Sequence, residues 1–370
     1  MKRRAPFLGL FGRLVLRDVV VHVGLALVSG LVLFIAIDTV ETGNVMEGRG
    51  SAVDLVLLEV YNLPQVYQQL AVFAALVGSA TAVGSLVRRG EVLAVFSAGG
   101  PPSSVAKPAF LAGLFFALGY AGVAEWITPP ARAELAATRR RLGLPAAGAD
   151  AVHRGQSWFR GRELFYRIGS LEDQAGRTLG GVLMLRLEGG RLLDRWDVER
   201  LRWDGTGWIA EGCVHRKLQA DAIQTERHEE RPLALSELPE DFVVSVAAPH
   251  RLPYRALRET LRVRERLGQP SIEHRVELWR RHTLPLLNIL AVMLGAGVGL
   301  RLGKKPTFAA ALAAGTSLGF FVWLLEEVNV AMATGAALSP GAATHLAPLI
   351  LAALSSLAWW VAQRRGIRGG

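Results

Sequence analysis

The chain contains six apolar stretches, each long enough for a helix to cross a bilayer, and a long polar segment divides them three and three. Apolar residues make up 51% of the sequence, which agrees with this pattern. We therefore predict a polytopic membrane protein with one large domain outside the bilayer, which narrows its function to transport, signalling or chemistry on lipids. The predicted spans are Val19–Ile37, Leu63–Val87, Val105–Ala124, Leu284–Leu300, Phe308–Leu325 and His345–Ala362.

Lysine and arginine gather in alternate short loops. They occur before the first predicted span, between the second and third, between the fourth and fifth, and after the sixth. The opposite short loops, 38–62 and 326–344, contain a single positively charged residue, Arg49. Because short positively charged loops stay in the cytoplasm, we predict that both termini are cytoplasmic. The polar insert, from Glu125 to about His282, then lies on the other side of the membrane.

The net charge of +10 would suggest nucleic-acid binding in a soluble protein. Here much of the excess follows from the charged loops, and no aromatic-basic recognition motif accompanies it, so we predict no nucleic-acid partner. The only cysteine, Cys213, excludes an intrachain disulfide, and we interpret it as a small buried residue. Cys213, His215 and His228 are too few for a convincing metal site, so we predict neither a metal nor a cofactor.

The insert is typical of a β domain between helices. A helix is predicted over 130–142, and amphipathic spacing predicts a helical pair from Tyr254 to Trp279 that returns to the bilayer. A hairpin turn is predicted at 203–208. Short strands at this spacing favour a sandwich or open barrel, whose edge either pairs with a partner strand or is closed within the domain. The predicted strands lie in Ser157–Ile168, Val182–Leu187, Leu192–Arg202 and Ile209–Arg216.

The loop after the second span carries the clearest candidate for a partner contact. A short helix is predicted over Glu91–Ala98 and ends at Gly99-Gly100. With an acid at its start and an exposed apolar face, such a helix suits a cytoplasmic partner; an ordinary turn helix is the alternative.

The sequence lacks the motifs of several enzymes. It contains no G-x-x-x-x-G-K-[ST] loop for ATP and no H-E-x-x-H. No G-x-S-x-G occurs in a hydrolase context. We therefore predict a non-catalytic protein, and keep a membrane-anchored sensor or scaffold and a lipid-modifying enzyme as alternatives.

Four segments, in this order and spacing, resemble the lipopolysaccharide export permeases of the LptF/LptG family, and look closer to LptG. The resemblance extends over nearly the whole chain. The segments are Arg88–Gly99, Glu125–Pro129, Trp158–Ile168 and Glu277–Leu286.

The resemblance implies six transmembrane helices and a periplasmic β-jellyroll in a bacterial inner membrane protein. The expected parts are three. Residues 1–128 hold an interfacial helix and the first three spans, with a coupling helix near 91–98; residues 129–282 hold the jellyroll with flanking helices; and residues 283–370 hold the last three spans. It also implies that the chain is an ABC transporter permease, paired with a sister LptF or LptG on an LptB-type ATPase dimer. Lipopolysaccharide would pass from the membrane through the jellyroll to LptC and LptA.

The resemblance also implies roles for individual residues. Glu91 would be the acid of the coupling helix that meets the ATPase, and Ala94, Ala98 and Gly99 would shape that helix. The sequence departs from the family in Gly100-Pro101-Pro102 and in the acids Asp38 and Glu41, which stand where relatives have basic contacts to lipid phosphates. Phosphate contacts are therefore expected elsewhere, at Arg49, Arg132, Arg255, Arg258 and Arg262.

Overall fold

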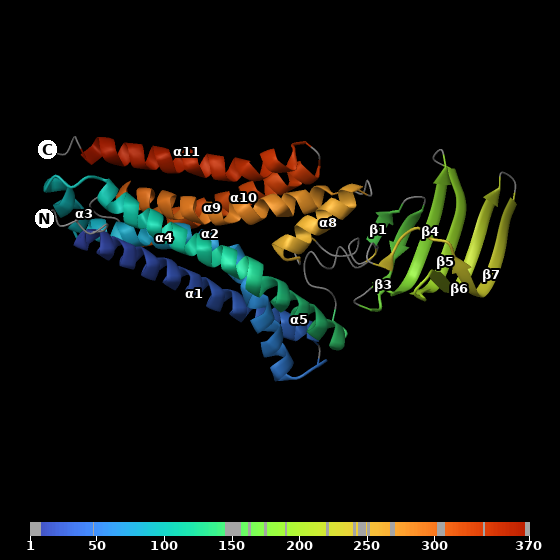
Figure 1. Ribbon diagram of the computed structural model, residues 1–370. Coiled ribbons are helices and arrows are strands. Elements are labelled where there is room, and N and C mark those ends of the chain that lie inside the picture. The colour runs from blue at the N-terminus through green and yellow to red at the C-terminus, as the bar shows by residue number, and fades with distance from the viewer. Residues whose placement is uncertain are drawn as a thin grey trace, which may run out of the picture. The chain divides into compact units, whose positions relative to one another are not determined.

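The chain folds into two compact units, residues 1–142 together with 275–370, and residues 143–274 (Figure 1). The computed structural model describes residues 9–46, 48–144, 157–161, 164–173, 176–188, 191–219, 222–239, 242, 249, 252–266, 271–301, 308–335 and 337–366.

The first unit is a helical bundle. Six helical segments of its described residues are long and apolar enough to cross a membrane, which confirms the six predicted spans. The short α3 (Glu91–Ser97) lies between two of them. The six are α1 (Leu10–Met46), α2 (Ala52–Arg88), α4 (Ser103–Gly122) continued by α5 (Thr128–Arg141), α9 (Ile272–Arg301), α10 (Phe308–Thr334) and α11 (Pro340–Gly366).

Helix α2 forms the centre of this bundle. In its most apolar window 72% of the residues are buried, against 6% in α1. Glycines bring the neighbouring helices close: a Cβ added at Gly78 would lie 2.8 Å from the carbonyl carbon of His22, and one at Gly315 would lie 2.7 Å from the Cα of Val77. Gly295 and Gly299 of α9 pack against α2 in the same way. Small residues thus allow close packing within one chain.

Helices α4 and α5 are joined by a π-helical segment, Val123–Ile127. The predicted helix over 130–142 therefore exists, but as the continuation of the third span. Pro129 and Pro130 lack the N–H groups that an α-helix needs, and the wider turn before them accommodates this loss. Arg281 of α9 donates a hydrogen bond from Nη1 to the Ala124 carbonyl (2.9 Å), which ties the wider turn to α9.

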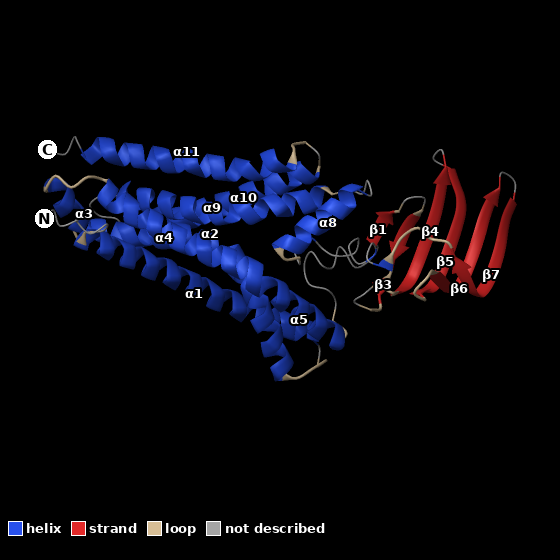
Figure 2. Cartoon of the chain, viewed as in Figure 1, coloured by secondary structure: helices blue, strands red, loops and turns tan. Residues whose placement is uncertain are grey.

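The second unit is built on one antiparallel sheet (Figure 2). Its order is β1-β2-β4-β5-β6-β7, and the short β3 also pairs with β4. The four predicted strand regions are confirmed, while β3 and β7 were not predicted. The strands are β1 (Ser157–Arg160), β2 (Phe165–Ile168), β3 (Ser170–Leu171), β4 (Thr178–Glu188), β5 (Arg191–Trp203), β6 (Trp208–Gln219) and β7 (Ala222–Leu233).

One face of the sheet carries an apolar core around Tyr166, Trp208 and Phe242. Along the strands the buried side chains shift between even-numbered and odd-numbered positions. In β5, for example, the shift occurs between Val198 and Leu201. Gly212 of β6 lies at this change and has a φ of 62°, a left-handed conformation that favours glycine. The predicted hairpin turn is also present: the Asp204 carboxylate accepts hydrogen bonds from the Thr206 and Gly207 amides, both 2.7 Å.

The expected β domain is confirmed, and its described strands form a single sheet. Helix α8 (Tyr254–Arg266) matches the first member of the predicted returning pair. The second member, from Ile272 to Trp279, is not a separate helix but the first part of α9. The fourth span is therefore the later part of a longer helix that begins at Ile272.

Candidate functional site

The start of α3 is set by a glycine between two charged residues. Helix α2 ends at Arg88, and Gly90 has a φ of 78°, which allows the chain to reverse direction before α3. Glu91 occupies the first helical position. A carboxylate there is favoured, because the amide groups of the first turn lack partners within the helix.

The end of α3 is a Schellman motif. The Gly100 amide donates to the Val95 carbonyl (2.8 Å), and the Gly99 amide donates to the Phe96 carbonyl (3.1 Å). Gly99 has the left-handed φ of 80° that this motif requires. A Cβ on Gly100 would lie 2.5 Å from Cγ1 of Val95, so glycine is also needed at this position. Thus Gly100-Pro101-Pro102, the departure from the family pattern, still ends the helix cleanly.

The two sides of α3 differ in burial. Val92 is 3% exposed and joins the core of the bundle, where the partly buried Phe96 packs beside it. Ala94 and Ala98 are exposed, and 55% of the neighbouring Leu93 is exposed to solvent. Glu91, Ala94 and Ala98 are spaced by three and four residues, so the helix brings them to one face. This face offers an acid and small side chains, and Leu93 lies on an adjoining side of the helix.

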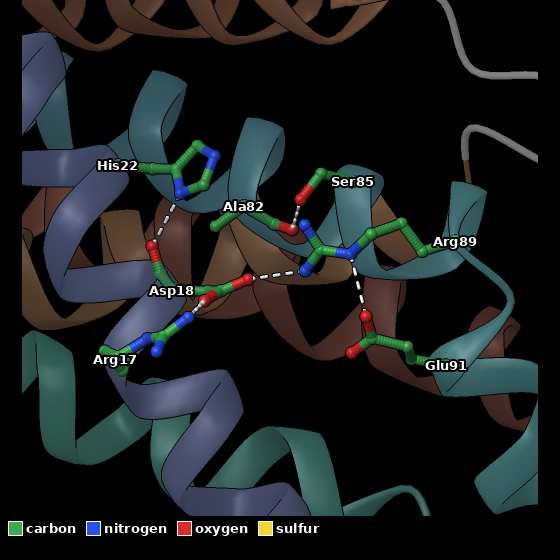
Figure 3. A network of polar contacts seen from close by, with 7 residues as sticks. All are labelled: Arg17, Asp18, His22, Ala82, Ser85, Arg89 and Glu91. Carbon is green, nitrogen blue, oxygen red and sulfur yellow. Dashed lines mark hydrogen bonds and ion pairs between the residues drawn. The ribbon is translucent and has the colours of Figure 1, made fainter.

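Arg89 joins α3 to α1 through two ion pairs (Figure 3). Its Nη2 donates to Oδ2 of Asp18 at 2.6 Å, and its Nε donates to Oε1 of Glu91 at 2.8 Å. Asp18 is only 6% exposed, whereas the Arg89 side chain is 46% exposed. We call this arrangement the Asp18–Arg89–Glu91 bridge. It connects the first helix to the start of α3 at the end of the bundle where α1 begins and α11 ends (Figure 1).

A buried carboxylate is costly unless it is paired, so Arg89 is important to Asp18. The second cation near Asp18 is Arg17, whose Nη2 lies 3.4 Å from Oδ1 and whose side chain is 74% exposed. The hydrogen bond with Asp18 is the largest of the effects that raise the pKa of Arg89 above its ordinary value. Arg89 therefore keeps its charge at any physiological pH. Removing it would cost about 1–3 kcal/mol, the usual penalty for a buried polar group that loses its partner.

Two polar side chains near the bridge, His22 and Ser85, form hydrogen bonds with the backbone of their own helices. The His22 ring nitrogen Nδ1 donates to the Asp18 carbonyl (2.8 Å), and Ser85 Oγ donates to the Ala82 carbonyl (2.8 Å) (Figure 3). Both bonds engage backbone oxygens one helical turn earlier. Consequently the Asp18 carboxylate itself remains available to the arginines.

The arginines expected to contact lipid phosphates lie in both units. Arg49 is exposed in the turn between α1 and α2, and Arg132 is partly buried on α5. Arg255, Arg258 and Arg262 are exposed on α8, where their spacing places them on one face. On the same helix Leu257 and Leu261 are buried. The structure thus groups the three α8 arginines, and separately places the other two in the bundle.

Within the described residues, no group of three or more histidine, cysteine, aspartate or glutamate side chains could hold a metal ion. Cys213 is buried, as expected. Burial is the main effect that raises the pKa of its thiol, so it stays protonated at neutral pH.

The sequence did not indicate the role of Asp18. It lies 71 residues before Arg89, so no local pattern connects the two. Its burial is the property that distinguishes it, and burial is visible only once α1 and α2 are packed together.

A comparison with protein families finds one that covers almost the whole chain. The model of the family described as lipopolysaccharide export system permease LptF/LptG matches residues 13–364. No curated protein matches the chain.

Proposed function

We propose, because this chain belongs to the lipopolysaccharide export system permease family LptF/LptG, that it is the membrane-spanning subunit of an ATP-driven transporter. It would take lipopolysaccharide from the inner membrane and pass it toward the outer membrane. The six apolar helices support the membrane-spanning role. The missing phosphate-binding loop supports a separate ATPase of the LptB type.

The observation that carries this proposal is the exposed face of α3. A short helix that is anchored by Val92, presents Ala94 and Ala98 to solvent and carries the partly buried Glu91 at its start is suited to dock on a partner. An acid at the rim of such a face pairs well with a basic residue of an ATPase, and the alanines permit close approach. Binding and hydrolysis of ATP would then move α3, and the spans would follow.

The orientation of the chain follows from the same proposal. The end of the bundle that carries α3 would face the cytoplasm, together with both termini, as the distribution of positive loops supports. The β unit would lie in the periplasm, and its sheet would receive lipid and hand it to LptC and LptA. The sparse burial of α1 supports pairing with a sister permease along this helix.

Lipid phosphates would be held by arginines. The exposed row of Arg255, Arg258 and Arg262 supports this role for α8, because a guanidinium group can form bidentate hydrogen bonds with a phosphate. Arg49 and Arg132 are the corresponding candidates in the bundle.

Replacing Glu91 tests the proposal. The complex would be purified through a tag on this chain carrying Glu91→Gln, and the bound ATPase and ATP-dependent lipopolysaccharide extraction would be measured. We expect extraction to fall about tenfold, since a truncated charge pair at an interface costs 1.4 kcal/mol or more. Glu134→Gln, an exposed acid on α5, is the control. Full ATPase binding and full extraction by the Glu91 variant would contradict the proposal.

A further inference from the structure

We propose that Asp18 and Arg89 are positioning residues that carry the movement of α3 to the first helix. This inference rests on the proposed function of α3 as the docking helix. In this account the Asp18–Arg89–Glu91 bridge is the connection through which the ATPase moves α1.

The geometry of Arg89 supports a bridge in which one side chain serves both helices. Its guanidinium holds Asp18 of α1 by Nη2 and Glu91 of α3 by Nε at the same time. Because the group is planar and rigid, a displacement of one carboxylate displaces the donor that holds the other. The two acids are therefore coupled in position, although 73 residue numbers separate them (91 − 18).

Helix α1 is well placed to respond. Near α3 it buries Gly12, Val15, Asp18, Val19 and Val23. From residue 24 to residue 41 it buries no side chain within its own chain, and burial resumes only at Thr42. The helix is therefore most deeply buried at the end where Asp18 lies, and farther along it is held by polar contacts such as the hydrogen bond from Asn62 to Asp38 (3.0 Å). A small rotation at the Asp18 end moves a long segment whose side chains are only partly buried.

The apolar contacts between α3 and α1 explain a directed movement of α1 less well than the Asp18–Arg89–Glu91 bridge does. Val92 packs in the core of the bundle with α1 residues such as Val15 and Val19. Such contacts are non-directional, so they tolerate sliding. Charge-assisted hydrogen bonds depend on distance and angle, and they transmit displacement along a defined direction.

The test uses the complete complex, reconstituted with its ATPase and sister permease in vesicles that contain lipopolysaccharide. Asp18→Asn, Arg89→Gln and the double variant would be compared with Arg88→Gln, which removes the same charge from the exposed neighbouring residue. Three quantities are measured: ATPase bound, ATP hydrolysed, and lipid extracted. The ratio of lipid to ATP is the decisive one, because a merely stabilising ion pair would lower the amount of complex and leave this ratio unchanged.

We expect Asp18→Asn and Arg89→Gln to bind the ATPase normally but to extract at least about fivefold less lipid per ATP, the lower range of coupling between sites. The double variant should be no worse than either single one, because all three remove the same connection. Arg89→Lys, which keeps the charge but holds one carboxylate at a time, should be intermediate. It also provides a second variant if the others fold poorly.

Two results would overturn the inference. One is a ratio of lipid to ATP in Asp18→Asn that equals that of Arg88→Gln. The other is defects that multiply in the double variant, which would show that Asp18 and Arg89 act separately. If the unmodified complex captured no ATPase at all, the proposed function itself would be wrong, and the inference would fall with it.

Discussion

At the scale of single residues, the sequence predicted some of the side chains that form the α3 segment but not all of their contacts. The helix, its acid and its glycine end were predicted, because Glu91 and Gly99 carry local signals. The contact between Asp18 and Arg89 could not be predicted, because it depends on how α1 packs against α2. Because Asp18 is buried in the folded bundle, its carboxylate needs a charged partner.

Gly100→Ala tests the end of α3. The added methyl group would meet Val95 at 2.5 Å, so the Schellman motif must open, at a cost of about 1 kcal/mol or more. Hydrogen exchange at the Gly99 and Gly100 amides should become faster. Gly43→Ala in α1, where no atom lies within 4 Å of the new Cβ, is the control. Unchanged exchange in the Gly100 variant would show that the motif does not hold this end.

At the scale of secondary structure, strand β7 and the continuity of α4 with α5 escaped the sequence pattern for physical reasons. The β7 sequence, AIQTERHEERPL, is mostly charged or polar, yet its backbone pairs with β6 from Trp208 to Gln219. Backbone pairing with a neighbour therefore outweighed a poor strand propensity. The predicted helix began at Pro130, whereas a π-helical turn carries the third span into α5 without a break.

The change in buried positions along β6 depends on Gly212. Alanine there would have to adopt a φ near 62° and would also approach the Glu199 side chain to 2.7 Å. We expect Gly212→Ala to destabilise the β unit by about 1–2 kcal/mol. Tryptophan fluorescence during unfolding of the full chain would report it. Gly207→Ala is the matched control, because its Cβ would meet nothing within 4 Å; equal stability of the two variants would contradict this account.

The β unit should also lose stability in acid through Asp197. Burial opposes its ionisation, but Arg195 and Arg216 outweigh this, and the pKa of Asp197 lies below its ordinary value. A lowered folded-state pKa gives stability that is complete above about pH 4 and is lost as the pH falls through the folded pKa. Asp197→Asn should therefore flatten the acid limb of an unfolding curve. If it matched Glu229→Gln, an exposed control, the ion pairs would contribute nothing.

At the scale of the whole molecule, the division into a six-helix bundle and a β unit was predictable, because length and hydropathy determine which segments can cross a bilayer. The central place of α2 and the sparse burial of α1 were not. They depend on which glycines face a neighbour: Gly78 meets α1, whereas Gly24 has no atom within 4 Å of an added Cβ. Hydropathy does not distinguish the two positions.

This difference can be measured in the intact chain. Gly78→Ala should force α1 away from α2, since its Cβ would clash with the backbone of Val23, and should destabilise the bundle by about 1–3 kcal/mol. Gly24→Ala should leave it unchanged or slightly stabilised. Thermal unfolding in detergent compares the two. Similar behaviour of both variants would mean that the helices do not approach closely at Gly78.

The most direct test of the central claim is a purification of the tagged chain from bacterial membranes, with identification of the bound proteins and lipids. If the chain is an export permease that docks through α3, it will bring with it an ATPase with a phosphate-binding loop, a second permease and lipopolysaccharide. Recovery of the chain alone, without an ATPase and without glycolipid, would contradict the claim.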